Sequence, residues 1–120
     1  MRKFLPLCVV LLAGCGDRPT ADWVDQLRSK DATQRLHAIK ALQNKRAEAA
    51  TIVPVLSGAL RDEDPFVRRD AARALGNFGP EARPAVPALL PLLRDRNAGV
   101  RKATATALAV IDPAQPVRRR

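Results

Sequence analysis

The chain has few of the residues from which catalytic and metal sites are usually built. It contains one histidine, two cysteines and no tyrosine. Both cysteines, Cys8 and Cys15, lie within the first fifteen residues, so the remainder cannot form a disulfide framework. No further ligand stands at metal-binding spacing from His37, and no glycine-rich phosphate loop or nucleophile motif is present. We therefore predict no cofactor, no metal and no catalytic residue.

Aromatic residues are equally scarce, since the chain has three phenylalanines and one tryptophan. Hydrophobic residues nevertheless make up 47% of it, so the core must come from Leu, Val, Ile and Ala. Because Ala and Leu favour helix, this composition predicts an all-α protein. The length of 120 residues allows one domain. A formal charge of +9 indicates attraction to an anionic surface but identifies none.

The first fifteen residues have the order of an export signal. Arg2 and Lys3 form a basic start, and residues 4–13 carry no charge. This apolar run is too short to span a bilayer, which needs roughly 20 residues, but it fits the apolar region of an export signal. Residues 12–15, Leu-Ala-Gly-Cys, resemble the lipobox of bacterial lipoproteins.

The lipobox resemblance implies cleavage after Gly14 and attachment of lipid to Cys15. Residues 1–14 would be the signal peptide, and residues 15–19 the lipidated cysteine and a tether. Loss of Arg2 and Lys3 would lower the formal charge from +9 by two, to +7. In that family Cys15 would carry two or three acyl chains, which anchor a protein more firmly than a single chain does. Two alternatives remain open: an N-terminal helix with an incidental cysteine, and an ordinary secretory signal.

A unit of 33 residues recurs three times without a gap. Each unit is predicted to form two helices, and the second begins after a capping Asp or Asn. The caps are Asp31, Asp64 and Asn97. The columns that hold in all three units are Leu27, Leu60 and Leu93; Arg28, Arg61 and Arg94; Arg35, Arg68 and Arg101; Ala41, Ala74 and Ala107; and Leu42, Leu75 and Leu108.

Glycine and proline predict where the helices end or bend. In the middle unit, Gly76 and Gly79 are expected to end the second helix. The first helix of the third unit is predicted over residues 81–94 with a bend at Pro91, because proline removes an internal hydrogen bond. Pro54 is expected to bend the corresponding helix of the second unit.

These residues resemble short HEAT-like repeats of the kind named after phycobilisome lyases, most closely over residues 79–108. The resemblance covers roughly residues 20–112 and implies an α-solenoid of three helical hairpins. Its units are about 20–46, 47–79 and 80–112, and a basic tail, 113–120, follows. The first unit is degenerate, with Ser29 in place of an Asp and Gln34 in place of a core Val, which suits a terminal cap.

The resemblance also implies a ladder between units, in which a turn Asp faces an Arg of the second helix. The residues in these places are Asp62, Arg68, Asp95 and Arg101. In such arrays the second helices line the concave surface. Lys40, Arg69, Arg73 and Lys102 would therefore project into it and bind an acidic protein segment or another anion. The alternative is an ordinary solvated face.

Trp23 and His37 are the two remaining single residues of interest. Trp23 aligns with core leucines, so it is expected to close the first unit as an apolar plug, or else to stack on a partner. His37 is expected to face solvent, because Asp70 and Ala103 take its place in the other units. Arg118, Arg119 and Arg120 could contact anionic lipid or simply extend into solvent.

Together these patterns predict a lipid-anchored protein of the bacterial envelope that faces the periplasm and presents a small surface for protein–protein interaction. In the lipoprotein family an Asp after the lipidated cysteine often marks retention in the inner membrane, so the resemblance, with Gly16 in this place, favours the outer membrane. A phycobilin-lyase-like enzyme is one alternative. A basic solenoid that binds nucleic acid is another, although export argues against it. The partner is expected to be a protein or peptide with acidic residues.

Overall fold

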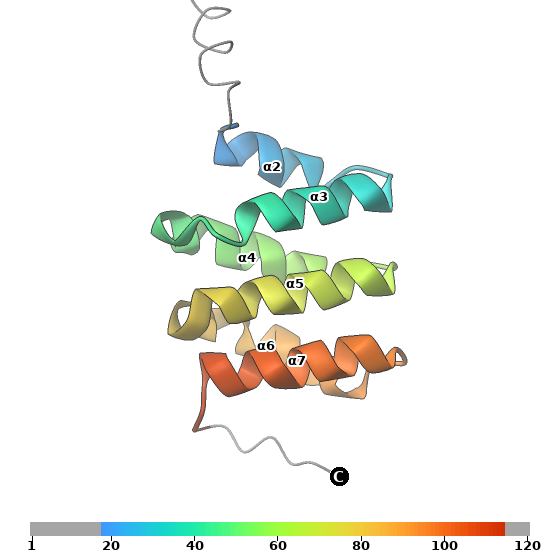
Figure 1. The fold of residues 1–120 in the computed structure, drawn as a ribbon, viewed down its shortest axis with the longest axis vertical. Coiled ribbons are helices and arrows are strands. Elements are labelled where there is room, and N and C mark those ends of the chain that lie inside the picture. Colours follow the sequence, from blue (N-terminus) through green and yellow to red (C-terminus); the bar gives the residue numbers. More distant parts are fainter. Residues whose placement is uncertain (1–17, 115–120) are drawn as a thin grey trace, which may run out of the picture.

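The computed structural model describes residues 18–114, which form helices and no strand. Three helical hairpins stack on one another, with α3, α5 and α7 side by side in one layer and their partner helices behind (Figure 1). The predicted all-α solenoid is confirmed. The signal peptide, Cys15 and residues 115–120 of the tail lie outside the described residues. The elements are α2 (Thr20–Gln26), α3 (Ala32–Leu42), η1 (Arg46–Glu48), α4 (Ala49–Ala59), α5 (Pro65–Phe78), η2 (Gly79–Ala85), α6 (Val86–Leu89), η3 (Leu90–Arg94) and α7 (Ala98–Ile111).

The helices of the front layer begin at the predicted caps. Asp31 accepts a hydrogen bond from the backbone N–H of Thr33 at 2.9 Å, and Asp64 accepts one from that of Phe66 at 2.7 Å. Asn97 accepts one from the N–H of Val100 at 3.1 Å. Because each cap satisfies a free N–H of the first turn, the three second helices start at equivalent positions.

The repeat columns form the core between the two layers. Leu42, Leu75 and Leu108 are fully buried, as are Leu56 and Leu89 of the rear layer. These side chains recur every 33 residues, so each new hairpin places the same leucines against the previous ones. The aliphatic core predicted from the composition is confirmed.

Proline interrupts the rear helix of the third unit more than the sequence predicted. Residues 81–94 were expected to form one helix with a bend at Pro91, and that expectation was wrong. The segment instead divides into η2, α6 and η3, because Pro84, Pro87 and Pro91 each remove a backbone donor within eight residues. A single proline, Pro54, is tolerated, since α4 continues through it to Ala59.

The two glycines expected to end α5 have different roles. Gly79 lies just after the helix with φ of 62°, a conformation that favours glycine. Gly76 lies inside α5, so its predicted role was wrong. A Cβ atom at Gly76 would be 3.3 Å from Cα of Ala107. The missing side chain therefore lets α5 and α7 pack closely.

The ladder joins Arg35 and Arg68 to the aspartate of the following unit. Arg35 Nε lies 2.8 Å from Asp62 Oδ2, and Arg68 Nε lies 2.9 Å from Asp95 Oδ2. The order of the four predicted residues sets Arg68 opposite Asp62 and Arg101 opposite Asp95, but Asp62 and Arg68 belong to different rungs. Arg35 is a member that the predicted set omitted, and Arg101 pairs with no carboxylate among residues 18–114.

Each ladder arginine is also held by its own unit. Nη1 of Arg35 donates to the carbonyl of Ser29 at 2.7 Å, and Nη1 of Arg68 donates to that of Asp62 at 2.8 Å. The first unit keeps this contact because it uses a backbone carbonyl, which Ser29 supplies as well as Asp does. One guanidinium therefore fixes its own turn and the next turn at the same time.

The ladder predicts how stability depends on acid. The Arg68 guanidinium, through its hydrogen bonds, lowers the pKa of Asp95 below its usual value. A carboxyl with a lowered folded-state pKa stabilises the fold fully above its unfolded-state pKa, about 4, and loses this effect as pH falls through the folded value. The difference in unfolding free energy between the wild type and Asp95→Asn should therefore shrink below about pH 4. Urea unfolding between pH 6 and pH 2 measures it, and a constant difference would contradict the assignment.

Candidate binding groove

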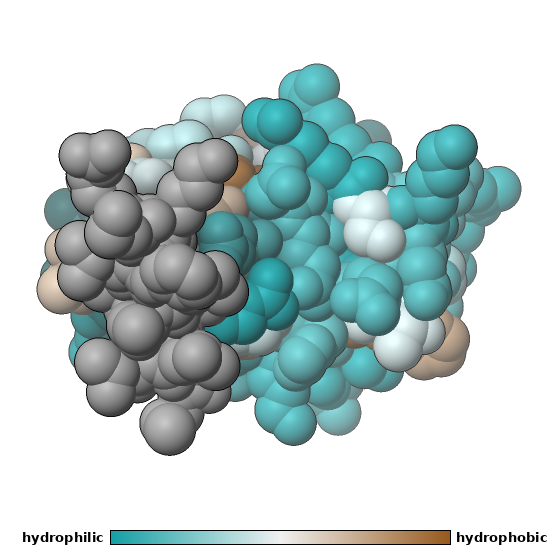
Figure 2. Space-filling model, turned by 90° about the horizontal axis from the view of Figure 1, so that it is seen from above, coloured by the Kyte–Doolittle hydropathy of each residue, from teal (hydrophilic) through white to brown (hydrophobic). Residues whose placement is uncertain are grey.

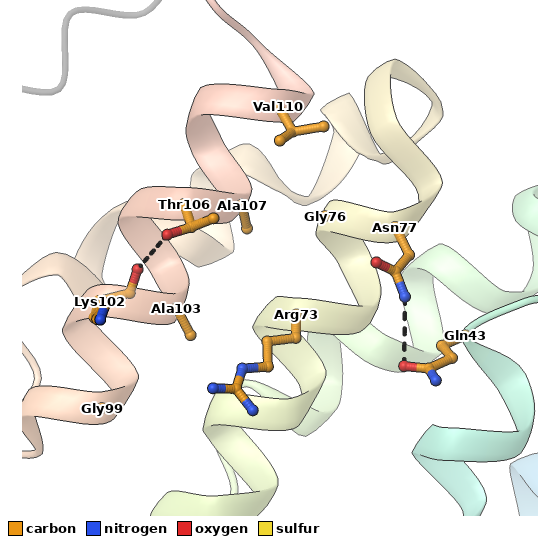
Figure 3. Close-up of a pocket in the computed structure, with 10 residues that line it drawn as sticks. All are labelled: Gln43, Arg73, Gly76, Asn77, Gly99, Lys102, Ala103, Thr106, Ala107 and Val110. Carbon is orange, nitrogen blue, oxygen red and sulfur yellow. Dashed lines mark hydrogen bonds between the residues drawn. The ribbon is translucent and has the colours of Figure 1, made fainter.

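The layer of second helices carries two adjoining hollows, which together we name the groove. One lies between α3 and α5 and has a volume of about 540 Å³. The other lies between α5 and α7, with a volume of about 490 Å³ (Figure 3). Gln43 and Arg73 line both hollows, so the two form one continuous surface across the three units.

All four basic residues predicted for the concave face line this groove. Lys40 and Arg69 line the first hollow, Lys102 lines the second, and Arg73 lines both. The repeat explains this grouping, because Lys40 and Arg73 occupy one repeat column and Arg69 and Lys102 another. Equivalent positions on stacked helices face the same side, so the 33-residue period places the cations in register.

One carboxylate, Asp70, lies among these cations and was missed as a groove residue. Its Oδ1 is 3.0 Å from Arg69 Nε and 3.9 Å from Arg73 Nη1. The i, i+3 spacing of Asp70 and Arg73 on one helix was a signal for this pair. Four cations and one carboxylate give the groove a formal net charge of +3.

The cations of the groove differ in how far they are exposed to solvent. The Arg73 side chain is 62% exposed, against 29% for Arg69. Arg69 is occupied, since its guanidinium lies 5.0 Å from the Phe66 ring centre as well as beside Asp70. Lys40 and Lys102 are exposed. Arg73, Lys40 and Lys102 are therefore the residues best placed to meet an anionic ligand.

The floor of the hollow between α5 and α7 is small and apolar. Gly76, Ala103 and Ala107 line it, and Val110 stands at its edge with half of its surface exposed (Figure 3). Asn77 donates from Nδ2 to Oε1 of Gln43 at 3.4 Å across the boundary with the other hollow. These neutral residues were not predicted, because their grouping depends on how closely α5 and α7 pack.

Trp23 and His37 lie at the N-terminal end of the array, in contact with each other. Trp23 packs against the core but stays partly exposed, unlike the buried leucines of its column. Its ring is covered by the Arg18 guanidinium at 4.2 Å and meets the His37 ring edge-on at 5.3 Å. His37 is exposed, as predicted, and lines the rim of the groove. Trp23 thus closes the first unit as the prediction stated, although only in part.

The side chains of the groove can bind a ligand by charge and by apolar contact. In residues 18–114, no group of three or more His, Cys, Asp or Glu side chains lies close enough to hold a metal ion. Over the same range, no helix is long and apolar enough to cross a membrane.

Comparison with known families agrees with this architecture. The sequence profile of HEAT repeats matches residues 20–109, which is 90 of the 120 residues. The chain therefore belongs to the HEAT-repeat family. HEAT repeats commonly mediate protein–protein interaction. No protein of curated function matches the chain.

Proposed function

We propose that this protein is a lipid-anchored, non-enzymatic component of a bacterial envelope whose groove binds an acidic segment of a partner protein. The observation that carries the proposal is the groove itself: exposed Arg73 and Lys102 line the hollow with the small apolar floor, and exposed Lys40 lines the adjoining hollow. Such a surface suits a segment that presents carboxylates beside a small apolar side chain. Charge attraction speeds the encounter, and burial of the apolar side chain slows dissociation.

The size of the groove favours a segment over a large folded face. It crosses only three units, the fewest from which such arrays are usually stable. A helix or an extended peptide laid across α3, α5 and α7 would contact both hollows. The single carboxylate of the groove, Asp70, lies 3.0 Å from Arg69 and 3.9 Å from Arg73, so it offsets part of the charge on α5 and leaves the groove with a net positive charge for the partner.

Lipid anchoring rests on the first fifteen residues, where a basic start, an apolar run and Cys15 follow in the order of a lipoprotein signal. With lipid on Cys15, residues 16–19 are a tether of a few residues, so the array would stand close to the membrane. Anchoring would raise the local concentration of the groove near partners in the same membrane. We place it facing the periplasm, with the outer membrane favoured.

The anchoring proposal is tested by metabolic labelling with a palmitate analogue. The wild type is expected to be labelled and to sediment with membranes, and Cys15→Ala is expected to lose both properties. Cys8→Ala provides the matched control, because Cys8 lies in the segment that cleavage would remove. Labelling that persists in Cys15→Ala, or an unlabelled wild type, would contradict lipid attachment at this residue.

The groove proposal is tested by a photo-crosslinking amino acid placed at Thr106, an exposed and uncharged groove residue. In cells, this variant is expected to give a discrete adduct with one protein, and the crosslinked peptide is expected to be rich in Asp or Glu. The control places the same amino acid at exposed Ala50, on the rear layer. Equal adducts at both positions, or an adduct with nucleic acid, would contradict the proposal.

A further inference from the structure

The two ends of the array differ in the residues by which one unit packs on the next. These residues lie on one face of the second helices, α3, α5 and α7. On α3 with its C-cap residue, and on α5, three residues at steps of four face the following unit, and α7 carries three residues at the equivalent positions. In order along the chain they are Arg35, Ile39 and Gln43; Arg68, Ala72 and Gly76; and Arg101, Ala105 and Ala109.

The first two of these faces are covered by the next unit. Arg68 binds Asp95 of the third unit, and a Cβ atom at Gly76 would be 3.3 Å from Cα of Ala107. The middle residues of the two faces, Ile39 and Ala72, have 1% and 0% of their surface exposed. Each face therefore consists of a central buried contact with an arginine at one end that receives a carboxylate.

The third face, on α7, has the same arrangement of residues, but no other unit within residues 18–114 packs on it. Arg101 and Ala109 are exposed, and Ala105 is partly exposed. Nη1 of Arg101 donates to the carbonyls of Asp95 at 2.6 Å and Arg96 at 3.2 Å. Arg68 makes the equivalent contacts to its own turn, at 2.8 and 3.1 Å. The Arg101 guanidinium is thus held by its own turn in the same way as that of Arg68, which binds Asp95.

We propose that this end face, formed by Arg101, Ala105 and Ala109, docks a helical hairpin of a partner protein that presents an aspartate in the turn between its helices. We infer this ligand from the contacts between units within the array, where a turn aspartate binds the arginine of the preceding unit. Asp62 and Asp95 each accept the N–H of the residue two positions later at 2.9 Å, which fixes the carboxylate toward the arginine of the preceding unit. The small side chains of Ala105 and Ala109 allow a helix to approach closely.

A second copy of this chain stacked end to end does not supply that ligand. Its N-terminal unit has Ser29 where the aspartate is needed. Ser29 accepts the N–H of Asp31 at 3.2 Å and so forms a similar turn, but it brings no charge to Arg101. The visible part of that end is also mainly hydrophilic (Figure 2), in contrast to the alanines of the opposite end. The first unit therefore lacks the aspartate of a rung, whereas the third unit retains its arginine, Arg101.

The test uses a synthetic peptide of residues 80–112, the chain's own third hairpin, as the probe. Added to the isotope-labelled full chain, it is expected to shift the NMR amide signals of Ala105 and Ala109 in a saturable way. Arg101→Gln should weaken binding by about tenfold, the effect of one charged hydrogen-bonded pair. A peptide with Asp95→Asn should also bind the wild-type chain about tenfold more weakly. Its affinity for the Arg101→Gln chain should be little lower than that of the unchanged peptide, because the ion pair is already lost. Arg73→Glu, a groove variant, should leave binding unchanged, so this test is separate from that of the groove.

A fused protein guards against a probe that fails to fold alone. A second copy of residues 80–112 joined after Asp112 is expected to unfold together with the array, and Arg101→Gln is expected to uncouple it. The proposal is overturned if the fused unit unfolds separately from the array even though Arg101 is present. Self-association of the full chain that requires Arg101, measured by sedimentation, would also overturn it by assigning the face to a second copy.

Discussion

Replacing Asp95 with alanine is expected to lower the free energy of unfolding by about 3 kcal/mol. Asp95 holds Arg68 through two contacts, 2.9 Å to Nε and 3.1 Å to Nη2. The two side chains are only 8% and 13% exposed. The variant leaves Arg68 largely buried without its counter-ion, and this uncompensated charge, more than the lost attraction, accounts for the expected loss. Urea unfolding followed by circular dichroism measures it.

The matched control for this variant is Asp70→Ala, which removes the two ion pairs of Asp70, with Arg69 and Arg73, on the surface of the groove. Asp70 and Arg69 are each about 30% exposed, so water compensates for the lost partner. The expected loss is below about 1 kcal/mol. Equal losses in the two variants would show that the ladder stabilises the array no more than a surface pair does.

Replacing Gly76 with leucine is expected to lower the free energy of unfolding by about 3 kcal/mol, at the upper end of the usual cost of overpacking. Even a first side-chain carbon would contact Ala107 at 3.3 Å from its Cα and 3.4 Å from its Cβ. The neighbouring atoms belong to the backbone and to a short side chain, so they cannot rotate away. The α5 and α7 helices must separate, and the floor of the groove opens with them.

The same substitution at Gly58 provides the control. Gly58 lies inside α4, is exposed, and has no atom within 4 Å of a Cβ placed on it. Leucine there should stabilise the fold slightly, by about 0.5 kcal/mol, because leucine favours helix more than glycine does. Thermal unfolding of the two variants gives the comparison. A Gly76→Leu protein as stable as the wild type would rule out close packing of α5 and α7.

Much of the fold could be predicted because its signals are local and repeated. The caps Asp31, Asp64 and Asn97 act on backbone groups two or three residues away, so their effect is contained in a short stretch of sequence. The buried leucines recur at a fixed period. The four groove cations could also be predicted as a set, since they lie in two repeat columns on one side of the array.

The rest depends on how neighbouring units are offset. The sequence shows that aspartates and arginines recur, but only the stacking of hairpins decides that Arg68 binds Asp95 and not Asp62. Gly76 illustrates the same limit, because a glycine near a helix end and a glycine at a helix contact look alike in sequence. The division of residues 81–94 depends on the combined effect of three prolines.

The proposed groove and end-face sites use different residues of α7, so variants can separate them. Lys102 and Thr106 face the groove, while Arg101 and Ala105 face away from the second unit. The helical period of 3.6 residues separates the two sets. A variant in one set is therefore expected to leave the other function unchanged.

The central claim, that the charge of the groove selects its partner, is tested most directly by the yield of the Thr106 crosslink after charge reversal. With Arg73→Glu and Lys102→Glu together, the adduct is expected to disappear. With Arg61→Glu and Arg94→Glu, which change the charge equally at exposed sites outside the groove, the adduct is expected to remain. An adduct that survives the first pair of substitutions, or is lost equally with the second, would contradict the account.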